Sequence, residues 1–363
     1  MLEFGENTVM KTIKFALIGC GRISKRHAEL LHHHQIAGAE LVAVCDVNEN
    51  RARSAGELYK VPAFTDMHEM MAKVDIDVVS ILTPSGMHAE HTLAVAKYKK
   101  HIVVEKPMAL TLQDADRMIE ACKINNVHLF VVKQNRFNVP VVKLRQEFEQ
   151  GRFGKMVLGT VRVRWCRDQK YYAQDAWRGT WALDGGVFTN QASHHVDLLQ
   201  WMMGDVQSVF AKSGTFLVNT ETEDTGVALI TFKSGAIGVI EATTATRPQD
   251  LEGSLSLLGE GGTVEIGGFA VNKIKNWKFT HTTQEDENVI QNYSVNPPNV
   301  YGFGHKEYLE HVVRVLTQNE RTLVTGVDGR KSLELITAIY ESIETKREIQ
   351  FPFQPSKCRL GRS

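Results

Sequence analysis

A chain of 363 residues exceeds the usual size of one domain, so we expect two domains, each with its own hydrophobic core. Lysine plus arginine and aspartate plus glutamate are both 42, and this net charge of zero argues against nucleic acid or a membrane surface as a partner. The five cysteines form no CxxC pair and no apolar run reaches the ~18 to 20 residues of a membrane span. We therefore expect reduced thiols, no metal site and a cytoplasmic protein.

The first third of the chain predicts a parallel sheet covered by helices on both faces. Continuous apolar runs, typical of buried strands, alternate with stretches of helical periodicity. We expect strands at 13–18, 41–45, 78–82, 102–104 and 127–132, and helices at 22–34, 48–59, 88–99 and 112–125, with Asn48 as a helix cap. This α/β order predicts a Rossmann dinucleotide-binding domain over residues 10–135.

The pattern changes after about Asn135, where strands follow one another through glycine-rich turns. We expect strands at 156–165, 206–213, 226–232, 236–242 and 254–258, and helices at 192–203, 305–317 and 330–345. This order predicts an α+β domain over residues 136–355 with a large, mainly antiparallel open sheet, and a junction between Val132 and Pro140. Because an exposed apolar sheet face is costly in a monomer, we expect a homo-oligomer.

A glycine loop follows the first predicted strand and opens a helix. Its spacing is Gly19-x-Gly21-x-x-Ser24, in which the glycines allow a tight turn and let a pyrophosphate approach the helix N-terminus. Asp46, at the end of the second strand, can accept hydrogen bonds from the adenosine ribose and repels a 2′-phosphate. The sequence therefore predicts NAD rather than NADP, with an ordinary loop cap as the alternative for Asp46.

Two more segments follow strands of the same predicted sheet. Thr83-Pro84-Ser85 ends the third strand and is either a cofactor contact or a plain turn. Glu105-Lys106-Pro107 ends the fourth, which places Lys106 at the carboxyl edge, where ligands of open α/β folds bind. A lysine there can face a substrate oxygen, with a solvated surface lysine as the alternative.

A polar cluster is expected in the second domain. Gly185 and Gly186 indicate a turn, and a helix after it would place Asn190, His194 and Asp197 on one face. A histidine titrates near neutrality, so His194 can take the proton of an alcohol while a hydride leaves its carbon. The alternatives are a core histidine bonded to Asp197, or the neighbouring His195 as the active group.

The order of these motifs resembles the glucose-fructose oxidoreductase and inositol dehydrogenase family, Gfo/Idh/MocA. The motifs are the glycine loop, the acidic residue after the second strand, Glu-Lys-Pro, and Gly-Gly followed by His194 and Asp197. The resemblance covers nearly the whole chain and implies that Lys106 and His194 flank the substrate hydroxyl at the nicotinamide, in a dimer or tetramer. Inositol dehydrogenases carry an aspartate at the position of Asn190, so the chain departs from them there.

Four further segments are shared with one group of this family: Gln134-Asn135-Arg136-Phe137-Asn138, Tyr171-Tyr172, Trp177-Arg178-Gly179-Thr180-Trp181 and Asn190-Gln191-Ala192-Ser193-His194-His195. They resemble the WlbA group, which oxidises the 3-hydroxyl of UDP-N-acetyl-glucosaminuronic acid in surface-polysaccharide biosynthesis. Arg136 and Arg178 suit a carboxylate or diphosphate, and the aromatic side chains suit a pocket wall. The resemblance also implies that NADH stays bound and is reoxidised by a second substrate such as 2-oxoglutarate.

We predict His194 as the base and Lys106 as the cation that stabilises the developing alkoxide, with exchanged roles as the alternative. The predicted substrate contacts are Lys106, Arg136, Arg178, Asn190 and His194. The predicted cofactor contacts are Gly19, Gly21, Arg22, Ile23, Asp46, Thr83, Pro84, His88, Glu105 and Lys106. Two other functions stay open: a dehydrogenase or ketoreductase of another sugar or polyol such as inositol, and a regulator that binds NAD and a sugar without turnover.

Overall fold

The first domain is built around a six-stranded parallel sheet, in the order β3-β2-β1-β4-β5-β6. The computed structural model describes residues 11–294 and 304–362, so Met10, where we set the start of this domain, lies outside the described residues. The strands are β1 Ile13–Ile18, β2 Ala39–Cys45, β3 Ala63–Phe64, β4 Val78–Ile81, β5 His101–Val104 and β6 Leu129–Val131. The helices are α1 Arg22–His32, α2 Glu49–Tyr59, α3 Met67–Lys73, the 3-10 turn η1 Ser85–Met87, α4 His88–Ala96 and α5 Leu112–Ile124.

The local signals that predicted these elements act as expected. Asn48 caps α2 by accepting a 3.1 Å hydrogen bond from the Arg51 N–H. The central strands β1, β4 and β5 are almost fully buried, as continuous apolar runs in a parallel sheet should be. The sequence patterns did not reveal β3 and α3, which follow α2 and precede β4 in the chain. In the sheet, β3 is the edge strand beside β2.

The strand order places a topological switch between β1 and β4. From β1 the chain moves outward to β2 and β3, and it returns to β4 on the other side of β1. Ligands of open α/β sheets bind at the carboxyl ends of the strands beside such a switch. Gly19, after β1, and Thr83, after β4, both lie there.

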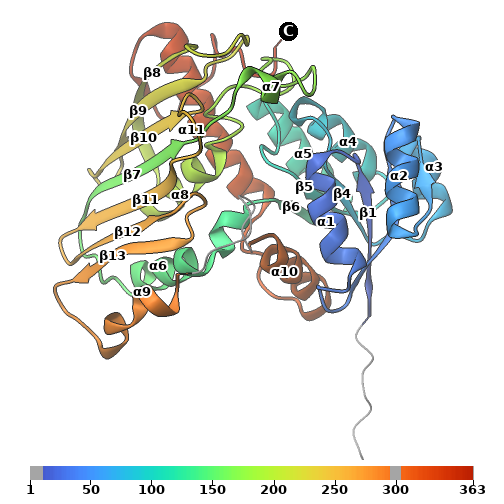
Figure 1. The fold of residues 1–363 in the computed structure, drawn as a ribbon, viewed down its shortest axis with the longest axis horizontal. Coiled ribbons are helices and arrows are strands. Elements are labelled where there is room, and N and C mark those ends of the chain that lie inside the picture. Colours follow the sequence, from blue (N-terminus) through green and yellow to red (C-terminus); the bar gives the residue numbers. More distant parts are fainter. Residues whose placement is uncertain (1–10, 295–303, 363) are drawn as a thin grey trace, which may run out of the picture.

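The second domain contains an eight-stranded sheet, in the order β13-β12-β11-β7-β10-β9-β8-β14. Figure 1 shows this sheet beside the first domain. Its strands are β7 Met156–Arg164, β8 Val206–Gly214, β9 Thr225–Phe232, β10 Ile237–Thr243, β11 Glu252–Gly259, β12 Gly262–Gly267, β13 Lys273–Phe279 and β14 Ile349–Gln350. Among these neighbours only β7 and β10 run parallel, which confirms the mainly antiparallel sheet.

Helices cover one face of this sheet. They are α6 Val139–Glu149, α8 Ser193–Met203 and α11 Gly326–Thr345; the shorter or peripheral elements are η2 Gln134–Phe137, α7 Gln169–Tyr172, η3 Gln284–Glu287, α9 Val289–Asn292 and α10 Gly304–Gln318. Gly159 of β7 lets α8 approach closely, because a Cβ there would lie 2.7 Å from Leu199 Cδ1. The other face exposes Val227, Leu229 and Ile237, which are 44%, 52% and 53% accessible.

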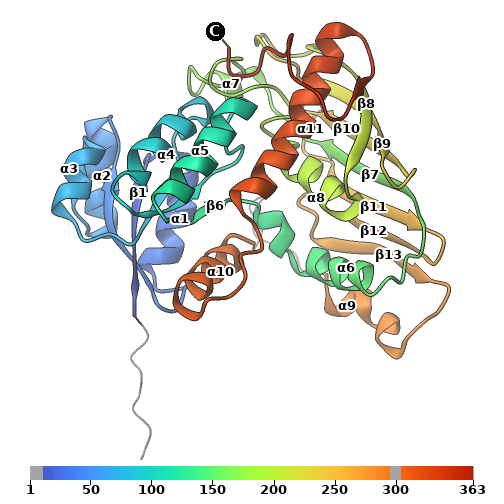
Figure 2. The ribbon, with the colours of Figure 1, turned by 180° about the vertical axis from the view of Figure 1, so that it is seen from behind.

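Helix α11 belongs to both domains. It packs against α5 and β6 of the first domain and against α8 and β8 of the second. Figure 2 shows it running between α5 and the second sheet. No helix among residues 11–294 and 304–362 has the length and apolarity that crossing a membrane requires.

One helix boundary differs from the expectation in a way that matters for the site. Helix α8 begins at Ser193, so Asn190 lies in the turn before it and does not share a helical face with His194 and Asp197.

Strands β12 and β13 were also missed by the sequence patterns. The predicted domain limits stay a prediction.

Candidate active site

A cleft of about 1220 Å³ lies at the carboxyl ends of the first domain's strands and reaches the turn before α8. This exceeds the roughly 300–1,000 Å³ of a typical single-ligand pocket, so it can take a dinucleotide and a second molecule. Its walls include every predicted cofactor contact: Gly19, Gly21, Arg22, Ile23, Asp46, Thr83, Pro84, His88, Glu105 and Lys106. Of the predicted substrate contacts, Lys106, Arg178, Asn190 and His194 lie in the same cleft.

The glycine loop has the geometry that a bound pyrophosphate needs. Gly19 has a φ of +97°, and a Cβ there would lie 2.8 Å from the backbone of Leu82, so the position requires glycine. A Cβ at Gly21 would meet no atom within 4 Å, which leaves open space directly before the 11-residue helix α1. The backbone N–H groups and positive end of α1 therefore face a space suited to NAD.

Asp46 links the glycine loop to the end of β2. Its Oδ2 accepts a 2.8 Å hydrogen bond from the Cys20 N–H, and its Oδ1 accepts one of 2.8 Å from the Asn48 N–H. The loop-cap role that we considered as an alternative is thus real. Asp46 also lines the cleft, and a carboxylate has further lone pairs that ribose hydroxyls can use. The two roles are compatible.

Lys106 reaches across the cleft to the second domain. Its Nζ donates a 2.8 Å hydrogen bond to the backbone carbonyl of Asn190. Burial lowers the pKa of Lys106, while the negative charges of Glu105 and Asp184 act in the opposite direction. The side chain lines the cleft with few competing bonds, so the solvated surface lysine that we considered is not what the structure has.

His194 lies in the same cleft, at the start of α8. Its Nε2 is 2.9 Å from Gln134 Nε2, and no hydrogen bond to Asp197 is present, so the alternative of a core histidine held by Asp197 is wrong. Burial, followed by the positive charges of Lys106 and Lys133, holds the pKa of His194 well below its ordinary value. The imidazole is therefore neutral at neutral pH and can accept a proton.

A buried carboxylate that the sequence did not single out supports this pair. Asp184, directly before Gly185-Gly186, accepts hydrogen bonds from the Gly179 N–H at 2.8 Å and from Asn190 Nδ2 at 2.5 Å. Burial raises the pKa of Asp184 to about 6. Through Asn190, this carboxylate is connected to the carbonyl that holds Lys106.

Arginines and aromatic rings form another wall of the cleft. The guanidinium carbons of Arg178, Arg167 and Arg22 lie 4.7, 5.5 and 5.7 Å from the centroid of the Tyr171 ring. Arg178 also donates a 2.9 Å hydrogen bond to the Tyr171 hydroxyl and pairs with Asp175 at 3.1 Å. Three cations around one ring make this wall suitable for an anionic ligand.

Two predicted or considered residues lie away from the cleft. Arg136 makes a bidentate ion pair with Asp197, at 2.8 and 2.9 Å, and it is buried and does not line the cleft. We therefore withdraw Arg136 as a substrate contact, because its donors serve a buried carboxylate. His195 is fully buried against Trp165 and does not line the cleft, so it is not the active histidine.

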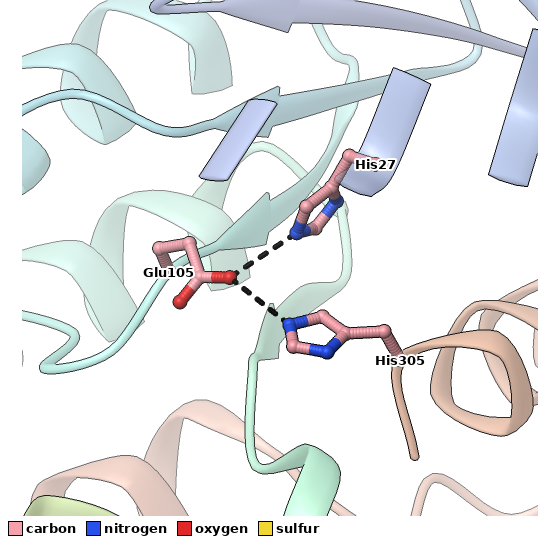
Figure 3. A group of neighbouring side chains, drawn as sticks. All are labelled: His27, Glu105 and His305. Atoms are coloured by element: carbon pink, nitrogen blue, oxygen red, sulfur yellow. Dashed lines mark hydrogen bonds and ion pairs between the residues drawn. The ribbon is translucent and has the colours of Figure 1, made fainter. Parts of the chain in front are cut away.

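A cluster of two histidines and a glutamate adjoins the cleft, whose wall includes Glu105 and His305. Figure 3 shows the rings of His27 and His305 directed at the same oxygen of Glu105, at 3.1 and 3.7 Å. One potential ligand atom from each residue lies within 4.8 Å of the other two, so the group is close enough together to hold a metal ion. Sequence patterns give no sign of this cluster, because its members come from three distant segments.

Comparisons with known proteins agree with this geometry. Residues 13–133 match the NAD-binding Rossmann-fold model of an oxidoreductase family, Gfo/Idh/MocA, and residues 145–351 match the C-terminal alpha/beta domain model of the same family. Myo-inositol 2-dehydrogenase of Thermotoga maritima is 32% identical over 345 residues, which cover 93% of this chain and 98% of that protein.

Two solved structures are similar over nearly their full length. The WlbA dehydrogenase of Bordetella pertussis, in complex with NADH and UDP-GlcNAcA, is 42% identical with a TM-score of 0.88, covering 95% of this chain and 99% of that one. The WlbA dehydrogenase of Chromobacterium violaceum, with the same two ligands, is 40% identical with a TM-score of 0.89, covering 98% and 100%. The predicted family, fold class and cofactor are thereby confirmed: the chain belongs to the Gfo/Idh/MocA oxidoreductase family and is an NAD-dependent dehydrogenase.

Proposed function

We propose that this protein oxidises the 3-hydroxyl of UDP-N-acetyl-glucosaminuronic acid, for use in surface-polysaccharide biosynthesis. The observation that carries the proposal is a single cleft with the reacting pair Lys106 and His194 at one end and the arginine-rich wall around Tyr171 beside it. A neutral polyol needs the first of these features and not the second. The similarity to two WlbA dehydrogenases crystallised with UDP-GlcNAcA supports the same substrate.

The position of Arg178 suits a carboxylate attached directly to the sugar ring. Arg178 lines the same cleft as Lys106, and its positive charge lowers the pKa of that lysine. Arg167 stacks on Trp165 and Tyr171 and pairs with Asp250 at 2.8 Å. We assign Arg178 to the uronate and Arg167, with Arg22, to the diphosphate.

The reacting groups divide the chemistry between them. NAD, when bound, supplies the acceptor for the hydride that leaves the carbinol carbon. His194, neutral in the cleft, accepts the hydroxyl proton at Nε2, the ring nitrogen whose lone pair faces the Gln134 amide N–H. The Lys106 ammonium stabilises the oxygen as negative charge develops on it. Asn190 holds Lys106 through its carbonyl. The exchanged assignment, with Lys106 as base, stays open because burial lowers the pKa of Lys106 as well.

Three further parts of the proposal concern the setting of the reaction. The protein acts in the cytoplasm as a homo-oligomer, a dimer or tetramer, in which the open sheet face with Val227, Leu229 and Ile237 is a subunit interface. NADH is reoxidised in place by a second substrate such as 2-oxoglutarate.

The competing substrate is an inositol or related polyol, favoured by the 32% identity to a myo-inositol 2-dehydrogenase. Asn190 argues for the nucleotide sugar, since the resemblance places an aspartate at that position in inositol dehydrogenases. NADH formation at 340 nm decides between them. We expect turnover with UDP-N-acetyl-glucosaminuronic acid and at least ~100-fold lower kcat/KM with myo-inositol; the reverse order would assign the polyol.

A further inference from the structure

Both oxygens of the Glu105 carboxylate are engaged by described groups. Oε2 accepts a 3.0 Å hydrogen bond from the backbone N–H of the next residue, Lys106. Oε1 lies 3.1 Å from His27 Nε2 and 3.7 Å from His305 Nε2 (Figure 3). An ionised carboxylate only accepts hydrogen bonds, so His27 carries its proton on Nε2. The carboxylate is thus held on one side by imidazoles and bonded on the other to the backbone of the reacting lysine.

The three residues come from segments that only the tertiary fold brings together. His27 lies on α1, Glu105 follows β5, and His305 lies on α10, which packs against α1 after the chain has passed through strands β7 to β13. All three side chains are buried, with residue accessibilities of 0%, 6% and 1%. A buried carboxylate without a cation beside it costs free energy unless hydrogen-bond donors surround it. We therefore expect the groups around Glu105 to be needed to keep its carboxylate in place.

Glu105 remains an anion in this arrangement. Burial alone would raise its pKa, but the hydrogen bond from His27 and the His305 imidazole 3.7 Å away hold the pKa of Glu105 well below its usual range. Among the charges around Lys106, Glu105 does most to keep the lysine protonated against the effect of burial. The other charged or titratable groups that act on Lys106 or Glu105 are Asp184, Arg178, Lys133, His194, His88 and Tyr308, and Arg26 acts on His305.

We propose that His27 and His305 are positioning residues, which hold the Glu105 carboxylate against the backbone of Lys106 so that its negative charge governs the protonation of the lysine. Of the two histidines, His27 does not line the cleft, whereas His305 lies in its wall. The inference rests on the proposed function for the role of Lys106, but the network itself can be tested without any substrate.

The test compares variants that remove or keep the hydrogen-bond donor. His27→Leu removes it and His305→Leu removes the second imidazole beside Glu105, whereas His27→Gln keeps a side-chain N–H near the position of Nε2. The matched control is His311→Leu: His311 is also a buried histidine of α10 paired with a carboxylate, Glu320 at 3.1 Å, but it lies away from the cleft. Glu105→Gln removes the charge with little change in size and serves if a leucine variant does not fold.

The readout is the pH at which Lys106 becomes nucleophilic, measured by competitive acetic anhydride labelling and peptide mass spectrometry. We expect the labelling midpoint of Lys106 to move down by about one pH unit, a tenfold change in the ionisation constant, in His27→Leu, His305→Leu and Glu105→Gln. It should stay near the wild-type value in His27→Gln and His311→Leu. The limb of the kcat–pH profile that Lys106 controls should move to lower pH by the same amount.

An unchanged midpoint in both His27→Leu and Glu105→Gln would overturn the proposal. A stoichiometric divalent metal in the purified wild-type protein, lost in His27→Leu by elemental mass spectrometry, would overturn it too, because the cluster would then be a metal site. If the wild type shows no turnover with the nucleotide sugar but the labelling shift is present, the proposed substrate fails and the network stands.

Discussion

The side-chain ammonium of Lys106 donates a 2.8 Å hydrogen bond to the backbone carbonyl of Asn190. This bond joins the end of β5 in the first domain to the turn before α8 in the second. It sets the lysine at the same cleft as His194 without using a carboxylate partner, so the ammonium remains available to a substrate oxygen. Neither domain alone contains the reacting pair.

We expect His194→Ala to lower kcat by roughly 10²- to 10⁴-fold, because it removes the proton acceptor. NAD affinity should change little, since no predicted cofactor contact is altered. The measurement is NADH formation at saturating UDP-sugar together with an NAD fluorescence titration.

The adjacent residue gives the control. His195 lies outside the cleft, so His195→Gln should retain turnover per folded molecule even if it unfolds at a lower temperature. Equal loss of kcat in both variants would contradict the assignment of His194.

Arg178→Met should raise the KM for UDP-N-acetyl-glucosaminuronic acid by about 10- to 100-fold, because a charge-assisted bond to the carboxylate is lost. The effect should be much smaller for UDP-N-acetylglucosamine, whose sugar is neutral. Initial rates with the two sugars measure this difference. Arg359→Met is a matched control: Arg359 stacks on Trp181 at 4.3 Å and bonds to Glu344, away from the cleft. A KM unchanged in Arg178→Met would remove Arg178 from the binding site.

Arg136→Met should act on stability instead of substrate affinity. It would leave the buried Asp197 with only Lys133, at 3.5 Å, and breaking such a pair costs on the order of 3–5 kcal/mol. Urea unfolding monitored by tryptophan fluorescence measures the loss. A normal unfolding midpoint combined with a raised KM would restore Arg136 as a substrate contact.

The ion pair between Arg136 and Asp197 should also make stability depend on pH. Burial alone would raise the pKa of Asp197, but the charges of Arg136 and Lys133 lower it below the ordinary value of an aspartate. A depressed carboxyl pKa contributes stability above the unfolded pKa, near 4, and this contribution is lost as the pH falls through the folded value. Arg136→Met should weaken that acid-side dependence.

Glu223 should make stability depend on pH in the direction opposite to that of Asp197. Its Oε1 accepts bonds from the Tyr340 hydroxyl at 2.8 Å and the Phe188 N–H at 3.1 Å, and burial raises the pKa of Glu223 to about 7. Because the folded state binds the proton more tightly, the free energy of unfolding should fall between about pH 4.5 and 7. Relative to Glu223→Gln, the wild type should lose on the order of 3 kcal/mol from pH 4 to pH 8 in urea titrations. A difference that does not vary with pH would show that Glu223 is already ionised.

The sequence predicts most of the first domain because its signals are local. A buried parallel strand is a continuous apolar run, and a glycine loop or an N-cap is defined within a few residues. In the second domain the strands β12 and β13 escape this approach. Strand β12 is short and has a glycine at each end, and β13 carries Lys273, Lys275 and Lys278, so few of their residues give an apolar signal.

The site could be predicted only in part, because several of its residues are defined by distant partners. Arg136 resembles a ligand contact until Asp197, 61 positions away, is seen to take its donors. The helix expected at Asn190 begins only at Ser193. In the segment before it, the Phe188 N–H bonds to the Glu223 carboxylate, and a Cβ at Gly186 would overlap that group. Asp184 gives no local signal beyond preceding two glycines.

The placement of α11 has a consequence for how the protein is made. The first domain is not complete when its sixth strand has been synthesised, since α11 covers α5 and β6 and α10 packs against α1. The ribosome must produce the entire second sheet up to β13 before these helices exist. Until then two surfaces stay open to solvent and chaperones. They are the surface of α5 that α11 later buries and the part of the cleft wall to which His305 belongs.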